Sequence, residues 1–159
     1  MATTETSATT VTAATTEASA ADRFRAAVEE RRTDALEELF TEDVRFYSPV
    51  KFKPFEGRAM VLGLFGVLLR TFEDFRYVGE LAGSAQTAAG VAGGSAESAI
   101  LIFRATVNGK EIHGIDLLQF DEAGRIKEFT VMVRPLSAVQ TLSEAVLSGL
   151  VADGLVPQP

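Results

Sequence analysis

The stretch from Lys110 to Pro135 constrains the fold more than any other part of the chain, because it has the pattern of two long strands joined by a tight turn. The turn covers residues 121–125, DEAGR, where Gly124 supplies the positive φ angle that such a turn needs. Alternation on the first strand places these residues on one face: Ile112, Gly114, Asp116, Leu118 and Phe120. Asp116 is the one acid on this apolar face, which makes it the most informative residue of the sequence.

Charge and composition exclude several classes of function. The chain has 159 residues, which suits one domain, and a formal net charge of −7. An acidic chain lacks the basic patches that bind nucleic acids or anionic membranes, so we expect neither partner. The absence of cysteine excludes thiolate metal sites, and a single histidine, His113, argues against a histidine-based metal centre. We therefore expect no metal ion.

The two ends of the chain are predicted to lie outside the folded domain. Residues 1–20 are mostly Thr, Ala, Ser and Glu, a composition that cannot bury an apolar face, so we expect a disordered tail. This segment lacks the basic start and apolar run of a secretory signal, and we expect a cytoplasmic protein. Residues 149–159 are predicted to form a loosely held tail. The domain then spans residues 21–148.

Between these ends, apolar periodicity predicts helices and long strands. The predicted helices begin near residue 21 and at 33 or 34, the second ending at 41–43, and two more cover 58–72 and 136–148. The predicted strands cover 44–48, 75–81 and 97–107, followed by the two strands within 110–135. Residues 83–96 are small and without pattern, which indicates a long mobile hairpin loop. This order predicts an α+β fold with helices packed on one face of a strongly curved, mostly antiparallel sheet.

The element order and several motifs together resemble a known family. The motifs are the hairpin turn Asn108-Gly109 and the stretch GIDLLQFDEAGRIKEF, which contains Asp116. Over roughly residues 21–135 the chain resembles the SnoaL-like branch of the nuclear transport factor 2-like superfamily, to which the ketosteroid isomerases also belong. The resemblance implies a cone-shaped sheet with helices on its concave face, an apolar pocket between them, and a homodimer formed through the outer sheet face. It implies no cofactor and no metal.

Compared residue by residue, the resemblance singles out Asp116, which sits where the isomerases place the protonated acid of their oxyanion hole. Ser48 stands where they have a general-base aspartate, and Phe24 where they have an oxyanion-hole tyrosine. A serine without a base cannot take a proton from carbon, which argues against steroid isomerisation. The Arg-x-Asp of limonene-epoxide-hydrolase-type members is absent too, because residues 101–105 are Leu-Ile-Phe-Arg-Ala.

Two interpretations of Asp116 remain open. It is either an acid with a perturbed pKa in a functional cleft, or a structural acid paired with Tyr47 or Arg45. His113 lies on the opposite strand face, which favours a surface or dimer-interface position. Arg45 and Arg134 are further candidates for binding a carboxylate.

A pocket for a small hydrophobic molecule is predicted around Asp116. Its predicted ligand-binding residues are Phe46, Ser48, Phe55, Leu101, Phe103, Leu118, Phe129 and Val131. Two functions fit this pocket: an enzyme that uses Asp116 as acid or base in isomerisation, cyclisation or hydrolysis, and a non-catalytic ligand-binding or dimerisation module. A second polar group within hydrogen-bond reach of Asp116 favours the enzyme, whereas a purely apolar wall favours binding. We also expect a homodimer, because one strand face would otherwise leave apolar side chains in water: Ile102, Ile115, Leu117 and Met132.

Overall fold

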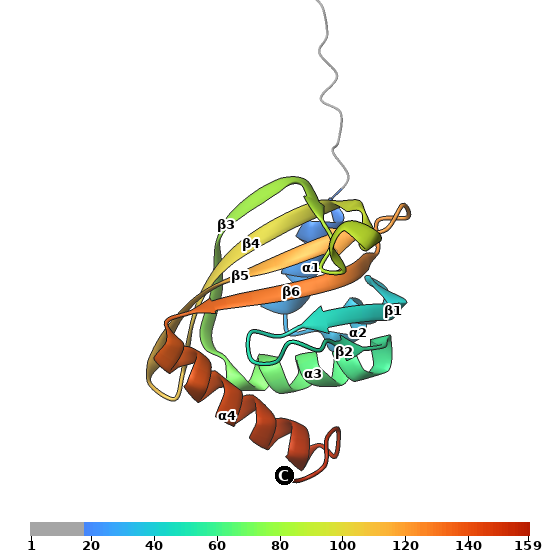
Figure 1. The fold of residues 1–159 in the computed structure, drawn as a ribbon. Coiled ribbons are helices and arrows are strands. Elements are labelled where there is room, and N and C mark those ends of the chain that lie inside the picture. The colour runs from blue at the N-terminus through green and yellow to red at the C-terminus, as the bar shows by residue number, and fades with distance from the viewer. Residues whose placement is uncertain (1–17) are drawn as a thin grey trace, which may run out of the picture.

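The computed structural model describes residues 18–159 (Figure 1). Most of the predicted tail at residues 1–20 therefore lies outside the described residues. The described elements are α1 (Ala20–Glu29), α2 (Thr33–Glu37), β1 (Phe40–Tyr47), β2 (Phe55–Glu56), α3 (Arg58–Thr71), β3 (Glu73–Gln86), the 3₁₀ helix η1 (Gly90–Gly93), β4 (Ser95–Val107), β5 (Lys110–Phe120), β6 (Ile126–Arg134) and α4 (Leu136–Ala152).

One curved, unclosed sheet of six strands forms the frame of the molecule, in the order β2-β1-β6-β5-β4-β3. Strands β3 to β6 form the predicted antiparallel meander, and β1 joins β6 in parallel. Helix α3 packs on β1, and α4 packs on β4, β5 and β6, so that both helices lie below the sheet in Figure 1. The predicted α+β fold class is confirmed.

The predicted turns form as expected and hold the register of the meander. Asn108 and Gly109 have φ angles of 47° and 77°, the left-handed pair that a tight hairpin turn requires. Gly124 has a φ angle of 79°, and the Asp121 carboxylate accepts a hydrogen bond from the amide of Arg125 at 2.9 Å. Because both turns are short and specific, they determine which β5 side chains face the helices.

A cluster of phenylalanine rings holds the helices to the sheet. Phe24 of α1 and Phe65 of α3 meet Phe129 of β6 with ring centroids 5.2 and 5.4 Å away. Phe40 and Phe46 of β1 complete the cluster. These rings are almost wholly buried, and truncating one such phenylalanine costs about 3–5 kcal/mol. The cluster therefore fixes how closely α1 and α3 approach the strands.

Strand β1 begins at Phe40, whereas the second helix was predicted to continue to residues 41–43, so α2 ends earlier than predicted, at Glu37. The spacing of Leu36, Leu39 and Phe40 fits a helix, and all three are buried, so burial alone does not distinguish helix from strand. Phe40 pairs with Ile126 of β6, whose amide donates to the Leu39 carbonyl at 2.7 Å. The parallel ladder with β6 overrides the local helical spacing.

The segment predicted as a loop, residues 83–96, is strand at both of its ends, so its predicted extent was wrong. Strand β3 runs to Gln86 and pairs with β4, leaving residues 87–94 as the hairpin end. The buried Glu128 carboxylate accepts a hydrogen bond from the Ala88 amide at 2.8 Å, and the buried Gln119 amide donates to the Gln86 carbonyl at 3.1 Å. These anchors come from β5 and β6, so no local pattern in the small residues reveals them.

Helix α4 extends to Ala152, past its predicted end at residue 148. Leu150 is 3% exposed, and the Arg70 side chain of α3 pairs with Asp153 at 2.7 Å. The predicted end of this helix at residue 148 was therefore wrong, since residues 149–152 continue the helix that packs on α3.

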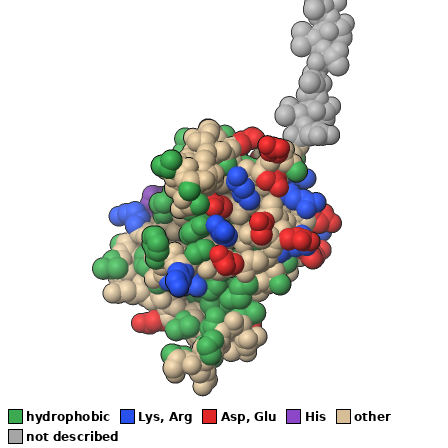
Figure 2. Space-filling view, turned by 45° about the vertical axis from the view of Figure 1, so that its right-hand side comes forward, with side chains coloured by type: hydrophobic (Ala, Val, Ile, Leu, Met, Phe, Trp, Pro, Cys, Tyr) green, Lys and Arg blue, Asp and Glu red, His purple; other side chains and the backbone are tan. Residues whose placement is uncertain are grey.

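Charges of both signs share the surface. On the face shown in Figure 2, Lys and Arg side chains lie among Asp and Glu side chains, so this face has no continuous basic patch. Within residues 18–159, no helix has the length and apolar character of a membrane span.

We predict that Gln119→Ala loosens the end of the β3–β4 hairpin. The substitution removes the donor to two hairpin carbonyls and the Ser98 hydroxyl, and each lost hydrogen bond costs about 1 kcal/mol. Amide hydrogen exchange across residues 87–94 should become several-fold faster, while Gln140→Ala at an exposed position of α4 should leave it unchanged. Equal exchange in both variants would show that other contacts hold the hairpin end.

Candidate functional site

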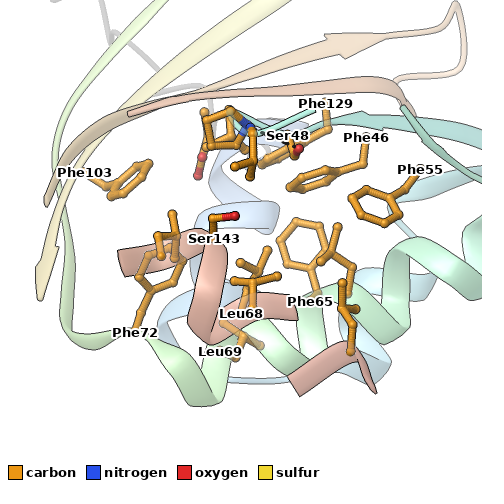
Figure 3. Close-up of a pocket in the computed structure, with 18 of the residues that line it drawn as sticks. Phe46, Ser48, Phe55, Phe65, Leu68, Leu69, Phe72, Phe103, Phe129 and Ser143 are labelled. Carbon is orange, nitrogen blue, oxygen red and sulfur yellow. Dashed lines mark hydrogen bonds between the residues drawn. The ribbon is translucent and has the colours of Figure 1, made fainter. Parts of the chain in front are cut away.

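A cavity of about 260 Å³ lies between the concave face of the sheet and helices α3 and α4 (Figure 3). Its wall is mostly apolar. The residues that line it are Val28, Phe46, Ser48, Pro49, Val50, Lys51, Phe55, Leu64, Phe65, Leu68, Leu69, Phe72, Phe75, Tyr77, Phe103, Asp116, Phe129, Val131, Leu142, Ser143, Val146, Leu147 and Leu150.

Most residues predicted to bind a ligand lie in this wall: Phe46, Ser48, Phe55, Phe103, Phe129 and Val131. Phe46 stacks on Phe129, with ring centroids 5.2 Å apart and ring planes 12° apart. Leu101 and Leu118 share the face of Asp116, but both are fully buried in the core outside the wall. The concave face is longer than the cavity, so strand alternation alone does not show where the helices cover it.

Two helices supply wall residues that the sequence pattern did not assign to a pocket. Helix α3 and the residue that follows it contribute Leu64, Phe65, Leu68, Leu69 and Phe72, and helix α4 contributes Leu142, Ser143, Val146, Leu147 and Leu150. On α3 the available signal was an apolar stripe wider than a single packing contact needs. The role of α4 in the wall depends on its tertiary packing. The helix continues through residues 149–152, and Leu150 of this last part lines the cavity.

Asp116 lies in the cavity wall near the middle of β5 and accepts a hydrogen bond from the Tyr77 hydroxyl at 2.9 Å. Only 6% of Asp116 and 7% of Tyr77 is exposed. Tyr77 lies on β3 two residues after Phe75, which also lines the cavity, so the two side chains share a strand face. This two-residue spacing was the signal in the sequence that could have identified the tyrosine.

The partners predicted for Asp116 from the sequence, Tyr47 and Arg45, were wrong. Both alternate with Phe46 on β1 and so lie on the other face of that strand, outside the cavity wall. Arg45 instead lies 3.7 Å from the Glu56 carboxylate.

Burial and the tyrosine act in opposite directions on the Asp116 carboxyl. The pKa of Asp116 is raised from 3.8 to about 7, because the effect of burial outweighs the hydrogen bond from Tyr77, which lowers the pKa by favouring the ionised form. The pKa of Tyr77 is raised well above 10.0 by burial and by the negative charge of Asp116. Tyr77 therefore keeps its proton at neutral pH and remains the donor, while Asp116 exchanges its proton in that range.

Gly114 makes room for an aromatic ring in the wall. It sits opposite Phe103 in the β4–β5 register, and a Cβ atom there would clash with the Phe103 ring and lie 2.8 Å from the Met132 carbonyl oxygen. The Phe103 ring lies over this strand backbone and forms one end of the group of side chains in Figure 3. The glycine beside Asp116 is thus explained by packing.

Three further polar side chains line the cavity. The Ser48 hydroxyl oxygen accepts hydrogen bonds from the amides of Val50 and Lys51, at 3.3 and 3.2 Å, which orders the loop after β1. The Lys51 ammonium lies 3.7 Å from the centroid of the Phe55 ring. Ser143 of α4 lies among the apolar side chains of the wall (Figure 3).

Other sequence candidates lie outside the cavity. Phe24 is fully buried in the phenylalanine cluster. His113 and Arg134 do not line the wall, and the pKa of His113 is lowered by desolvation and by the charges of Arg104 and Arg134. Within residues 18–159, no three carboxylate or imidazole groups are grouped so that they could hold a metal ion.

We predict that Asp116→Asn is neutral or stabilising at pH 7. The unfolded carboxyl loses its proton near pH 3.8 and the folded one near pH 7, so ionisation favours the unfolded chain between these values. The wild type should lose up to about 4 kcal/mol of unfolding free energy across that range, at about 1.4 kcal/mol per pKa unit. The variant cannot titrate there and should not show this loss.

Urea denaturation of both proteins between pH 4 and 8 measures this difference. A variant that is clearly destabilised at pH 7, beside a wild type that loses stability only on acidification, would identify Asp116 as an ionised structural partner.

The family model of the SnoaL-like domain matches residues 21–129. Among solved structures, a steroid delta-isomerase from Pseudomonas aeruginosa is 34% identical, with a TM-score of 0.74 over 86% of this chain and 93% of that one. A protein with a cystatin-like fold from Silicibacter pomeroyi is 26% identical, with a TM-score of 0.74 over 87% and 90% of the two chains. No curated protein is significantly similar to this chain.

At lower identity the fold alone is shared. A SnoaL-like protein from Burkholderia thailandensis is 15% identical, with a TM-score of 0.54 over 72% of this chain and 92% of that one. The matched family segment contains β1 to β5, the start of β6 and Asp116, but ends before α4. The chain therefore belongs to the SnoaL-like domain family and has its nuclear transport factor 2-like fold, as the resemblance in the sequence indicated.

Proposed function

We propose that this protein carries out acid–base chemistry, without a cofactor, on a small hydrophobic molecule bound in the cavity, with Asp116 as the proton carrier. The observation that supports this is a buried carboxyl, hydrogen-bonded to a tyrosine, in an otherwise apolar wall. A second polar group within reach of the acid is what separates an acid–base site from a plain binding pocket. The reaction types that fit are isomerisation, cyclisation and hydrolysis.

Asp116 suits this role because both of its forms are present near neutral pH. The protonated carboxyl can give its proton to a carbonyl or ether oxygen, and the carboxylate can take a proton from carbon. The apolar wall limits access of water, which strengthens the interaction between a developing charge and the carboxyl.

Tyr77 is a positioning residue in this proposal. Its hydroxyl donates to Oδ2 of Asp116, which leaves Oδ1 for the ligand. The same hydrogen bond opposes the rise in pKa caused by burial. Tyr77 thus sets both the orientation of the carboxyl and the pH at which it changes form.

The similarity to the steroid delta-isomerase of Pseudomonas aeruginosa supports a ligand with an apolar carbon skeleton. We do not extend that enzyme's reaction to this chain. Ser48 occupies the position where the ketosteroid isomerases have their general base, and its oxygen accepts two loop amides. One carboxyl would therefore carry the proton here.

A ligand-binding protein without catalysis is the alternative. Two positions favour it: Ser48 replaces the base, and Phe24 replaces a tyrosine with a ring buried in the core. In that case the pair of Asp116 and Tyr77 would bind one oxygen atom of the ligand without moving a proton.

Deuterium exchange at the α-carbon of a hydrophobic ketone, 2-tetralone in D₂O, tests the proposal by NMR. We predict exchange above the buffer rate that rises with pH and reaches half its maximum near pH 7. Tyr77→Phe should move this midpoint to higher pH, because the lost hydrogen bond favours the carboxylate.

Asp116→Asn should abolish the exchange, and Ser143→Ala is the control in the same wall. Exchange that is equally fast in Asp116→Asn, or absent from the wild type while the ketone binds, would favour the ligand-binding alternative.

We also propose a homodimer through the convex face of the sheet. Ile102, Ile115 and Leu117 are half-buried there, and Met132 is 54% exposed. These side chains alternate with the concave-face residues on β4, β5 and β6, so they form one apolar surface on adjoining strands.

Sedimentation measures this assembly, and we predict a dimer at tens of micromolar, the range in which a modest interface should hold together. Met132→Lys should shift the protein toward monomer, whereas Phe52→Lys, at an exposed position in the loop after β1, should not. A monomeric wild type at that concentration would contradict the assembly.

A further inference from the structure

We propose that Lys51 selects ligands with a negative charge at one end, so that the ligand of this cavity is a hydrophobic molecule with a terminal carboxylate. This inference rests on the proposed function, because it concerns the ligand of the same site. It adds a specificity-determining residue and a substrate class.

Lys51 is the only cationic side chain among the described residues that line the cavity. Its ammonium group lies 3.7 Å from the centroid of the Phe55 ring, a position that a cation–π interaction stabilises. No carboxylate in residues 18–159 lies within ion-pair distance of it. The ammonium is therefore held at the wall with its charge available to a ligand.

The loop that carries Lys51 is locally basic in an acidic protein. Residues 48–55, SPVKFKPF, contain two lysines and no acid, although the chain has a formal net charge of −7. The Ser48 hydroxyl oxygen orders this loop by accepting the amides of Val50 and Lys51. Of the two lysines, only Lys51 lines the cavity, which makes Lys53 a matched control.

The positions of Lys51 and Asp116 determine the orientation of such a ligand. Strand β6 lies between β1, which leads into the Lys51 loop, and β5, which carries Asp116, so the axes of β1 and β5 are about 10 Å apart and the two side chains come from different parts of the wall. A carboxylate is repelled by ionised Asp116 and attracted by Lys51. The charged end then lies at Lys51, and the apolar body extends along the phenylalanine wall toward Asp116 and Tyr77.

Two dyes with the same aromatic body test the charge requirement: neutral N-phenyl-1-naphthylamine and anionic 8-anilino-1-naphthalenesulfonate, whose sulfonate stands in for the carboxylate. Fluorescence titration gives the Kd of each dye for the full chain and three variants. We expect Lys51→Met to weaken binding of the anionic dye about fivefold or more, as loss of one charge pair should, and to leave the neutral dye within about twofold. Lys51→Arg should keep the anionic affinity, and Lys53→Met should change neither Kd by more than about twofold.

Several results would overturn the assignment. Equal effects of Lys51→Met on both dyes would mean that the side chain only packs against the ligand. A loss of anionic affinity in Lys53→Met as large as in Lys51→Met would mean general surface attraction. Failure of both dyes to bind would mean that the cavity does not accept amphipathic anions. The ketone exchange test of Asp116 is independent of all three results, so the acid–base proposal would stand or fall separately.

Discussion

The register of β5 between β4 and β6 is the constraint on which the rest of this site depends. Asp116 sits opposite Leu101 on one side and Val131 on the other, which places its carboxyl on the concave face. A slip of one residue would turn Asp116 to the convex face and put a neighbouring branched aliphatic side chain in its place. The tight turns at residues 108–109 and 121–125 hold this register at both ends of the strand.

This register buries the Asp116 carboxyl in an apolar wall, where it needs a hydrogen-bond partner. The Tyr77 hydroxyl is that partner. Burial disfavours the Asp116 carboxylate, while the Tyr77 hydroxyl stabilises it, so the pKa remains within the neutral range. The carboxyl is costly to the stability of the fold when ionised, and the same property makes it able to exchange a proton near pH 7. At Asp116, the burial that lowers the stability of the folded protein at neutral pH is also what allows proton exchange there.

Local sequence patterns correctly predicted the elements in which the spacing of apolar or turn residues matches the structure. The strand alternation around Asp116, the Asn108-Gly109 turn and the wide apolar stripe of α3 all appear in the structure as expected. The patterns failed where pairing or packing came from distant residues. Phe40 belongs to a strand because it pairs with β6, and the small residues near Gln86 form strands held by side chains of β5 and β6.

The sequence by itself determined the fold class, the place of Asp116 on an apolar strand face and six of the residues around the cavity: Phe46, Ser48, Phe55, Phe103, Phe129 and Val131. Most of these follow from periods of two and 3.6 residues, which a single element carries within itself, and Phe55 follows from being an aromatic residue on the loop beside a strand end. Only the tertiary structure decided that Tyr77 binds Asp116, that α4 closes the cavity and that Lys51 rather than Lys53 reaches its wall. Each of these contacts joins elements that are far apart in the chain. The curvature of the sheet and the packing of the helices determine how close those elements lie in space.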